Sequence, residues 1–148
     1  ILESTPPNEI WDLQFLATDI DLKVLAHAKE GIYKEAELEV VPPHIREKYF
    51  DRLAPGSFQV KKRFREMIEF ARLNLMEVPY NLNEGYDIIA CRNVLIYFDQ
   101  PTQKLVVENL STLLTKEHGL LFLGHSEAGA AKDTNTISIS HAIYIRKK

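Results

Sequence analysis

The stretch of residues 87–99, Asp-Ile-Ile-Ala-Cys-Arg-Asn-Val-Leu-Ile-Tyr-Phe-Asp, restricts the possible fold more than any other part of the chain. Residues 88–90 form a short apolar run, which is typical of a strand covered on both faces. Arg92 and Asn93 then interrupt it before a second apolar run at 94–98. Because ligands in open α/β sheets bind outside the carboxyl ends of the strands, this polar pair is a candidate site wall. The spacing alone fits an ordinary strand exit with a solvated arginine equally well.

The bulk properties indicate one domain of ordinary size, with 148 residues, 45% of them apolar. A net charge of −3 gives no electrostatic reason to expect nucleic acid or an anionic membrane as a partner. The sequence shows no signal-peptide pattern and no apolar run long enough for membrane insertion. The single cysteine fits a reducing compartment, so we expect a cytoplasmic protein. The chain begins at Ile1 without Met, and we expect it to be a piece of a longer protein.

Periodicity predicts strands that alternate with helices. The clearest helix begins at Asp99, an N-cap candidate followed by Pro101, and has a regular apolar stripe. The other expected elements are strands at 11–17, 86–91 and 119–124, a helix at 19–29, a helical segment at 35–51, a strand, basic helical turn and strand over 58–75, and antiparallel strands at 136–145. This order predicts a layered α/β domain.

Asp19 follows a predicted strand and opens a predicted helix. An acidic residue in this position commonly binds the two hydroxyls of a nucleoside ribose. The competing interpretation is that Thr18 or Asp19 caps the helix. Asn74, at the end of another strand, carries an amide that suits an adenine edge, but it fits a simple turn as well.

Two other polar features have ordinary interpretations. His125 and Glu127 form a His-x-Glu pattern, but the other histidines supply no usual ligand spacing, and we predict no metal site. Cys91 has no base near it in the sequence, which favours buried packing over a nucleophilic role. The sequence contains no P-loop and no Gly-x-Gly-x-x-Gly motif.

Taken together, several blocks resemble the chemotaxis receptor methyltransferases, the CheR family, from about residue 10 to the end of the chain. The two most specific are Cys-Arg-Asn-Val-Leu-Ile-Tyr-Phe from Cys91 and Gly-His-Ser-Glu from Gly124. The others are Leu-Ala-Thr-Asp-Ile-Asp at 16–21, Ala-Lys-Glu-Gly-Ile-Tyr at 28–33, Asn-Leu at 74–75 and Pro-Thr-Gln at 101–103.

The resemblance implies a Rossmann-like fold and transfer of a methyl group from S-adenosylmethionine to glutamate side chains of a chemoreceptor. It implies that Tyr97 faces the methyl group and substrate. The implied cofactor contacts are Asp19 for the ribose, Asn74 and Leu75 beside the adenine, and Arg92 and Asn93 at the strand exit. It also implies that residues 32–73 form a small inserted subdomain, which in some members docks a receptor peptide. The sequence leaves open whether it does so here.

The chain lacks the family's first strand, its glycine-rich loop and its helical N-terminal domain. Since neighbouring strands lie ~4.8 Å apart, loss of that strand predicts a gap of ~10 Å at the centre of the sheet. We expect upstream sequence to supply the strand, or this fragment to close the gap by re-pairing or by swapping a strand with another copy. The isolated fragment is expected to be inactive.

Two other functions remain open. The chain could be a non-catalytic signalling or partner-binding module that keeps the methyltransferase fold, or a methyltransferase with another substrate. Retention of the whole predicted residue set weighs against the binding module. The oligomeric state and the identity of the receptor do not follow from the sequence.

Overall fold

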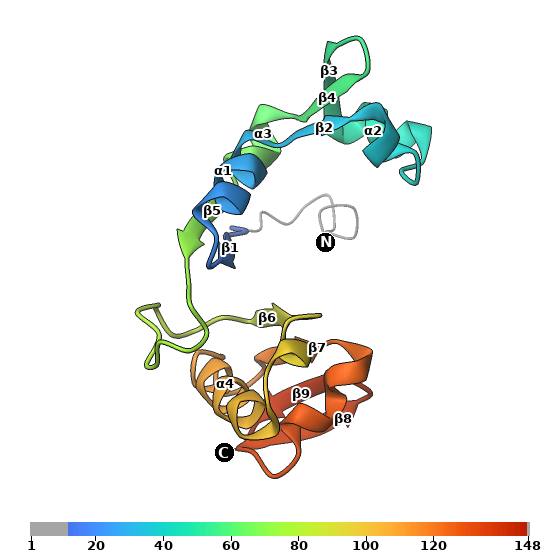
Figure 1. Cartoon of the computed structure of the whole chain (residues 1–148). Helices are drawn as coiled ribbons and strands as arrows, with labels where there is room; N and C mark the ends of the chain where they lie inside the picture. The colour runs from blue at the N-terminus through green and yellow to red at the C-terminus, as the bar shows by residue number, and fades with distance from the viewer. Residues whose placement is uncertain (1–11, 148) are drawn as a thin grey trace. The chain divides into compact units, whose positions relative to one another are not determined.

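The structure, a computed structural model, describes residues 12–147 (Figure 1). The chain divides into two compact units, Ile1–Asn74 and Leu75–Lys148. The division falls two residues after the strand that ends at Arg72, directly before a loop that contains Pro79 and Gly85. The N-terminal unit contains a two-stranded and a three-stranded sheet, and the C-terminal unit contains a four-stranded sheet.

The N-terminal unit is built on a parallel pair of strands, β1 (Phe15–Asp19) and β5 (Ile68–Arg72). The helix α1 (Leu22–Glu30) connects β1 to the rest of the unit and packs against both strands. Gly31 ends α1 with a φ of 62°, a left-handed conformation that costs a glycine little. The parallel pairing aligns Asp19 with Arg72, so both strands end at the same edge.

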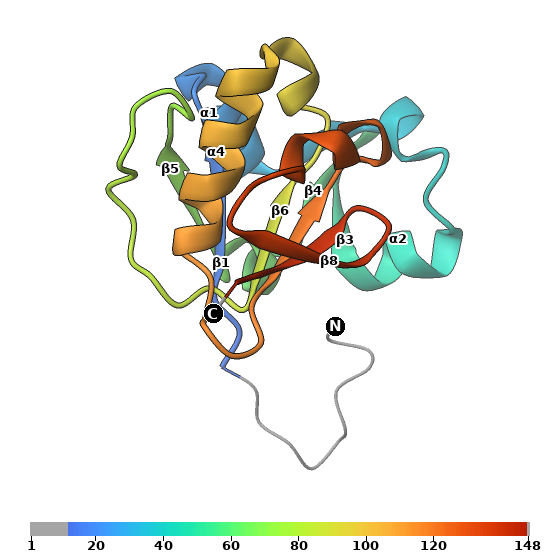
Figure 2. The ribbon, with the colours of Figure 1, turned by 90° about the horizontal axis from the view of Figure 1, so that it is seen from below.

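A three-stranded antiparallel sheet of order β2-β4-β3 lies within residues 32–73. Its strands are β2 (Ile32–Lys34), β3 (Phe50–Ala54) and β4 (Ser57–Val60), accompanied by η1 (Glu35–Leu38), α2 (Pro43–Tyr49) and α3 (Lys62–Arg65). Figure 2 shows α2 beside β3. The guanidinium groups of Arg46 and Arg52 lie 5.5 and 5.6 Å from the centre of the Phe58 ring, and Glu35 lies within 4.0 Å of both arginines.

The C-terminal unit is a four-stranded sheet of order β6-β7-β9-β8. Its strands are β6 (Ile88–Cys91), β7 (Leu120–Leu123), β8 (Thr136–Ser140) and β9 (Ile143–Arg146). The pair β6–β7 is parallel, whereas β9 is antiparallel to both of its neighbours. The remaining elements are α4 (Gln100–Thr112) and the short helices η2 (Leu95–Tyr97) and η3 (His125–Ala131).

The core of this unit forms between α4 and the sheet. One face of α4 supplies Val106, Val107 and Leu110, which are buried, and Leu121 of β7 is fully buried as well. Each such side chain contributes about 1.5–3 kcal/mol when it leaves water. The helix begins as the sequence predicts, because Asp99 accepts a hydrogen bond from the backbone N–H of Thr102 at 3.0 Å.

The structure confirms the predicted α/β class and corrects three local predictions. The segment 35–51 is not one helical unit, because Phe50 already begins β3 and pairs with Val60. The N-cap of α1 is Asp21, and neither Thr18 nor Asp19. The strand β6 is not covered on both faces, since Ile88 is 52% exposed. Trp11, the first residue of the predicted strand 11–17, lies outside the described residues.

Among residues 12–147, β1 has one partner strand, β5, and β6 has one partner strand, β7, and each pair lies within its own unit. None of the helices in the described part of the chain has the length and apolar character needed to span a membrane.

Candidate functional site

Asp19 is the last residue of β1, and its backbone links it to the end of β5. The N–H of Leu73 donates to the carbonyl of Asp19 at 3.0 Å, and Asn74 follows directly. The carboxylate of Asp19 accepts a hydrogen bond from the N–H of Asp21 at 2.9 Å. The structure therefore brings the predicted ribose ligand and the predicted adenine ligand to one edge of the N-terminal unit.

Leu75, the second residue of the predicted adenine pair, is the first residue of the C-terminal unit. Its carbonyl accepts a hydrogen bond from the hydroxyl of Tyr80 at 3.0 Å, which ties the start of the following loop to a buried side chain. Burial raises the pKa of Tyr80 to about 12, and the charge that Cys91 gains when its thiol ionises adds to this effect. The phenol therefore stays protonated and can hold this hydrogen bond at physiological pH.

The remaining predicted residues lie on one loop after β6. Arg92 and Asn93 are exposed, and Asn93 has a φ of 60°, a left-handed conformation that asparagine tolerates better than most residues. The short helix η2 then buries Leu95 completely, while Tyr97 is 81% exposed. The buried Leu95 thus anchors this loop in the core, while Arg92, Asn93 and Tyr97 are exposed on the surface of the unit.

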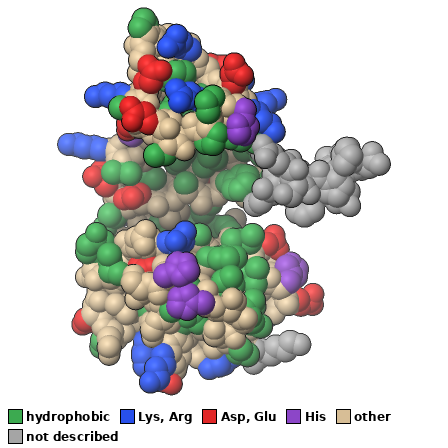
Figure 3. Space-filling model, turned by 90° about the vertical axis from the view of Figure 1, so that its right-hand side faces the viewer, with side chains coloured by type: hydrophobic (Ala, Val, Ile, Leu, Met, Phe, Trp, Pro, Cys, Tyr) green, Lys and Arg blue, Asp and Glu red, His purple; other side chains and the backbone are tan. Residues whose placement is uncertain are grey.

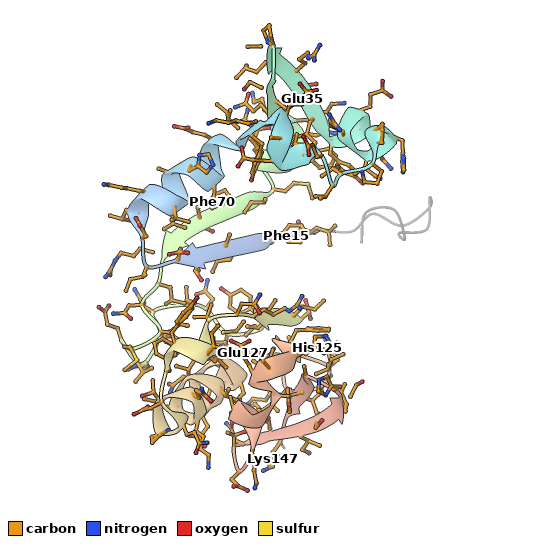
Figure 4. All side chains as sticks on the ribbon, turned by 45° about the vertical axis from the view of Figure 1, so that its right-hand side comes forward. Phe15, Glu35, Phe70, His125, Glu127 and Lys147 are labelled. Atoms are coloured by element: carbon orange, nitrogen blue, oxygen red, sulfur yellow. The ribbon has the colours of Figure 1, made fainter. Side chains whose placement is uncertain are left out.

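The side chain of Glu127, labelled in Figure 4, accepts hydrogen bonds from the backbone of this loop. It lies in η3, directly after β7, and only 3% of it is exposed. Its Oε1 accepts hydrogen bonds from the N–H groups of Val94, Leu95 and Ile96 at 2.8, 2.7 and 3.3 Å. Its Oε2 accepts from those of Asn93 and Gly124 at 2.8 and 2.7 Å. One carboxylate thereby satisfies five backbone donors.

The carboxylate of Glu127 is charged in this environment. Burial raises its pKa, but the hydrogen bonds from the backbone N–H groups lower it by more, so the pKa lies below its ordinary value of 4.5. The sequence interpretation included Glu127 only in a His-x-Glu pattern and in a family block. The available signal was an acidic residue three positions after Gly124, the glycine that follows a buried strand.

Gly124 makes room for this arrangement. A Cβ atom at this position would collide with Oε2 of Glu127 and lie 3.3 Å from Oδ1 of Asn93. The φ of Gly124 is −66°, which any residue can adopt, so the requirement is for space and not for backbone freedom.

Cys91 is buried at the end of β6 and is a packing residue, as the sequence predicts. Burial, and to a smaller extent the charge of Glu127, raises the pKa of its thiol to about 11.

No group of three or more His, Cys, Asp or Glu side chains in the described part of the chain is arranged to hold a metal ion. The rings of His125 and His141 lie 5.0 Å apart, and Figure 3 shows two neighbouring His side chains on this unit.

Residues 1–145 match the family described as "CheR methyltransferase, SAM binding domain". A chemotaxis protein methyltransferase from Borreliella burgdorferi is 40% identical over 78% of this chain, and one from Salmonella typhimurium is 43% identical over 75%. A probable chemotaxis protein methyltransferase from Rhizobium etli is 41% identical over 89% of this chain.

The chain spans 39–50% of the length of these three relatives. The matches confirm the resemblance and the Rossmann-like methyltransferase fold, and the description of the family agrees with S-adenosylmethionine as the predicted cofactor. The chain belongs to the CheR methyltransferase family.

Proposed function

We propose that the protein containing this chain is an S-adenosylmethionine-dependent methyltransferase that converts glutamate side chains of chemoreceptors to methyl esters. The observation that carries the proposal is the family match over residues 1–145, together with the names of the relatives. The names of the relatives support a methyltransferase of chemotaxis, and the family resemblance supplies the glutamate side chain as the substrate. We propose a cytoplasmic location because the single cysteine fits a reducing compartment. We also propose that residues 32–73 form a small subdomain inserted in the catalytic domain.

The proposed cofactor contacts lie where two pairs of parallel strands end. In the N-terminal unit, Asp19 would accept hydrogen bonds from the ribose hydroxyls, and Asn74 would contact the adenine edge. In the C-terminal unit, Leu75 would pack beside the adenine, and Arg92 and Asn93 would contact the cofactor from the loop after β6. These side chains offer the acceptors and donors that a nucleoside and an amino acid group require.

The chemistry requires little from acid–base catalysis. S-adenosylmethionine supplies an electrophilic methyl group on a sulfonium. A substrate glutamate is already ionised near neutral pH, and its oxygen can attack that carbon in line. A C–O bond forms as the C–S bond breaks, which gives the methyl ester and S-adenosylhomocysteine, and the two opposite charges cancel. Positioning and exclusion of water should therefore dominate the rate.

Tyr97 is the proposed catalytic residue. Its ring is 81% exposed on the C-terminal unit, and its hydroxyl can donate to or accept from the reacting groups. In this role it orients the glutamate carboxylate toward the methyl carbon, without taking or giving a proton in the transfer itself.

Calorimetry with S-adenosylhomocysteine tests the proposal, on this chain and on a full-length protein that contains it. Binding by the full-length protein alone, together with transfer of labelled methyl to a chemoreceptor, supports the proposal. Binding by neither favours a signalling module that keeps the fold without the reaction.

A further inference from the structure

Within residues 12–147, the buried carboxylate of Glu127 accepts hydrogen bonds only from backbone N–H groups. Both of its oxygens accept hydrogen bonds from backbone N–H groups, three at Oε1 and two at Oε2. With only 3% of the residue exposed, neither oxygen is open to a substrate. Glu127 therefore acts on its surroundings through the backbone of the residues that it contacts.

Those contacts concentrate on one short segment. Four of the five donors are consecutive residues, 93–96, and they directly precede Tyr97. For their N–H groups to converge on one carboxylate, the chain must turn sharply after β6, and the φ of 60° at Asn93 makes this turn. Successive N–H groups that point to one place form a concave anion site, which Glu127 fills from within the protein.

Without this anion the turn would lose its main support. The N–H groups of Leu95 and Gly124 are buried with the carboxylate, so water cannot replace it there. Hydrogen bonds to an ionised acceptor are also stronger than those between neutral groups. The segment 93–96 would then be free to leave the left-handed turn, and its side chains would move with it.

We propose that Glu127 is a positioning residue for methyl transfer, which fixes the Asn93–Ile96 backbone and thereby orients Asn93 and Tyr97 toward cofactor and substrate. The inference rests on the proposed function, since it assigns Glu127 a part in that reaction. It predicts a specific change in cofactor affinity and turnover, and not only a loss of folded protein.

Two variants of the full-length protein test this role by different means. Glu127→Gln keeps the shape but replaces one acceptor oxygen with an NH₂ group, which cannot accept from the two or three N–H groups that face it. Gly124→Ala keeps the charge but places a methyl group against Oε2 and so displaces the carboxylate. Gly129→Ala is the matched control, because it lies in the same short helix η3 and its Cβ would meet nothing within 4 Å.

Calorimetry and kinetics distinguish positioning from simple destabilisation. A positioning role predicts that Glu127→Gln and Gly124→Ala weaken S-adenosylhomocysteine binding by about tenfold or more, the effect of losing one charge-assisted hydrogen bond. The KM for S-adenosylmethionine should rise and kcat should fall, whereas Gly129→Ala matches the wild type. A lower binding stoichiometry with unchanged Kd and KM would mean that Glu127 only supports folding, and would overturn the proposal.

Amide hydrogen exchange on the wild type gives a readout that needs no variant. The N–H groups of residues 93–96 and Gly124 should be protected before any ligand is added, and rapid exchange there would overturn the proposal even if the variants do not fold. In folded Glu127→Gln, protection should fall at 93–96 and persist in α4. A wild type that fails to bind S-adenosylhomocysteine contradicts the proposed function, while its exchange pattern still reports whether Glu127 holds the turn.

Discussion

The carboxylate of Asp19 accepts a hydrogen bond from the backbone N–H of Asp21, at 2.9 Å, and Asp21 in turn accepts one from the N–H of Lys23, at 2.7 Å. The two acidic residues, which are two positions apart, therefore have different structural roles. Asp21 caps α1, while Asp19 ends β1 at the edge where Asn74 also lies. The sequence interpretation weighed capping against cofactor binding for Asp19, and capping belongs to its neighbour.

This separation predicts opposite results for two substitutions in the full-length protein. Asp21→Ala should lower the free energy of unfolding by about 1 kcal/mol, since it removes the helix cap, and should leave the affinity for S-adenosylhomocysteine unchanged. Asp19→Asn should weaken that affinity by roughly tenfold, because a neutral amide replaces the charged acceptor for the ribose hydroxyls. Chemical denaturation and calorimetry measure the two quantities. A loss of affinity in Asp21→Ala that equals the loss in Asp19→Asn would contradict the assignment.

Tyr97→Phe tests the proposed catalytic residue. The side chain is 81% exposed, so loss of its hydroxyl should leave the free energy of unfolding nearly unchanged. If the hydroxyl orients the substrate carboxylate, kcat should fall by about tenfold or more while the Kd for S-adenosylhomocysteine changes little. Steady-state kinetics and calorimetry on the same preparation provide the comparison, with Tyr97→Leu showing the added effect of the ring. Equal losses in kcat and in cofactor affinity would argue against this role.

Local sequence signals predicted the elements whose ends are set by neighbouring residues. The helix α4 begins as expected because Asp99 caps it and Pro101 lies in its first turn. The strand β7 and the antiparallel strands β8 and β9 also lie where apolar runs and alternation predicted them. The family blocks placed the candidate residues on the ends of strands and on the loop that follows β6.

Long-range contacts decided the features that the sequence did not reveal. Phe50 and Asp51 were predicted to continue the helical segment before them, yet they begin β3 because β4 offers a partner strand. Glu127 accepts hydrogen bonds from N–H groups that lie 31 to 34 residues earlier in the chain, and no local sequence pattern predicts contacts over such a separation. The exposure of Ile88 likewise depends on which elements cover the face of the sheet to which its side chain points, and the residues around it do not encode this.

Cys91 should resist alkylation at neutral pH. Its pKa rises from 9.0 to about 11, first through burial and then through the charge of Glu127. A difference of about two pKa units makes the reactive thiolate roughly 100-fold rarer at neutral pH, before the shielding by the surrounding side chains is counted. Mass spectrometry of the Cys91 peptide after iodoacetamide treatment, with and without denaturant, gives the rate ratio. Rapid labelling of the folded protein, or loss of methyl transfer in Cys91→Ala, would contradict a packing role.

The pKa of Glu127 predicts how its contribution to stability depends on pH. Because the folded protein holds this pKa below the ordinary value of 4.5, the unfolded chain takes up a proton first as the solution becomes acidic. The stabilisation by Glu127 is therefore complete above its ordinary, unfolded pKa of 4.5, and is lost as the pH falls through the lower value of the folded state.

The difference in unfolding free energy between the wild type and Glu127→Gln isolates this effect, since the amide of the variant does not titrate and other acids, such as Asp99, occur in both proteins. Denaturant titrations from about pH 7 to about pH 3 should show a constant difference down to about pH 5.5 and a shrinking one below about pH 4.5. A difference that stays constant to the lowest pH, or that grows with acidity, would mean that the carboxylate is not held in its charged form by the amides of residues 93–96.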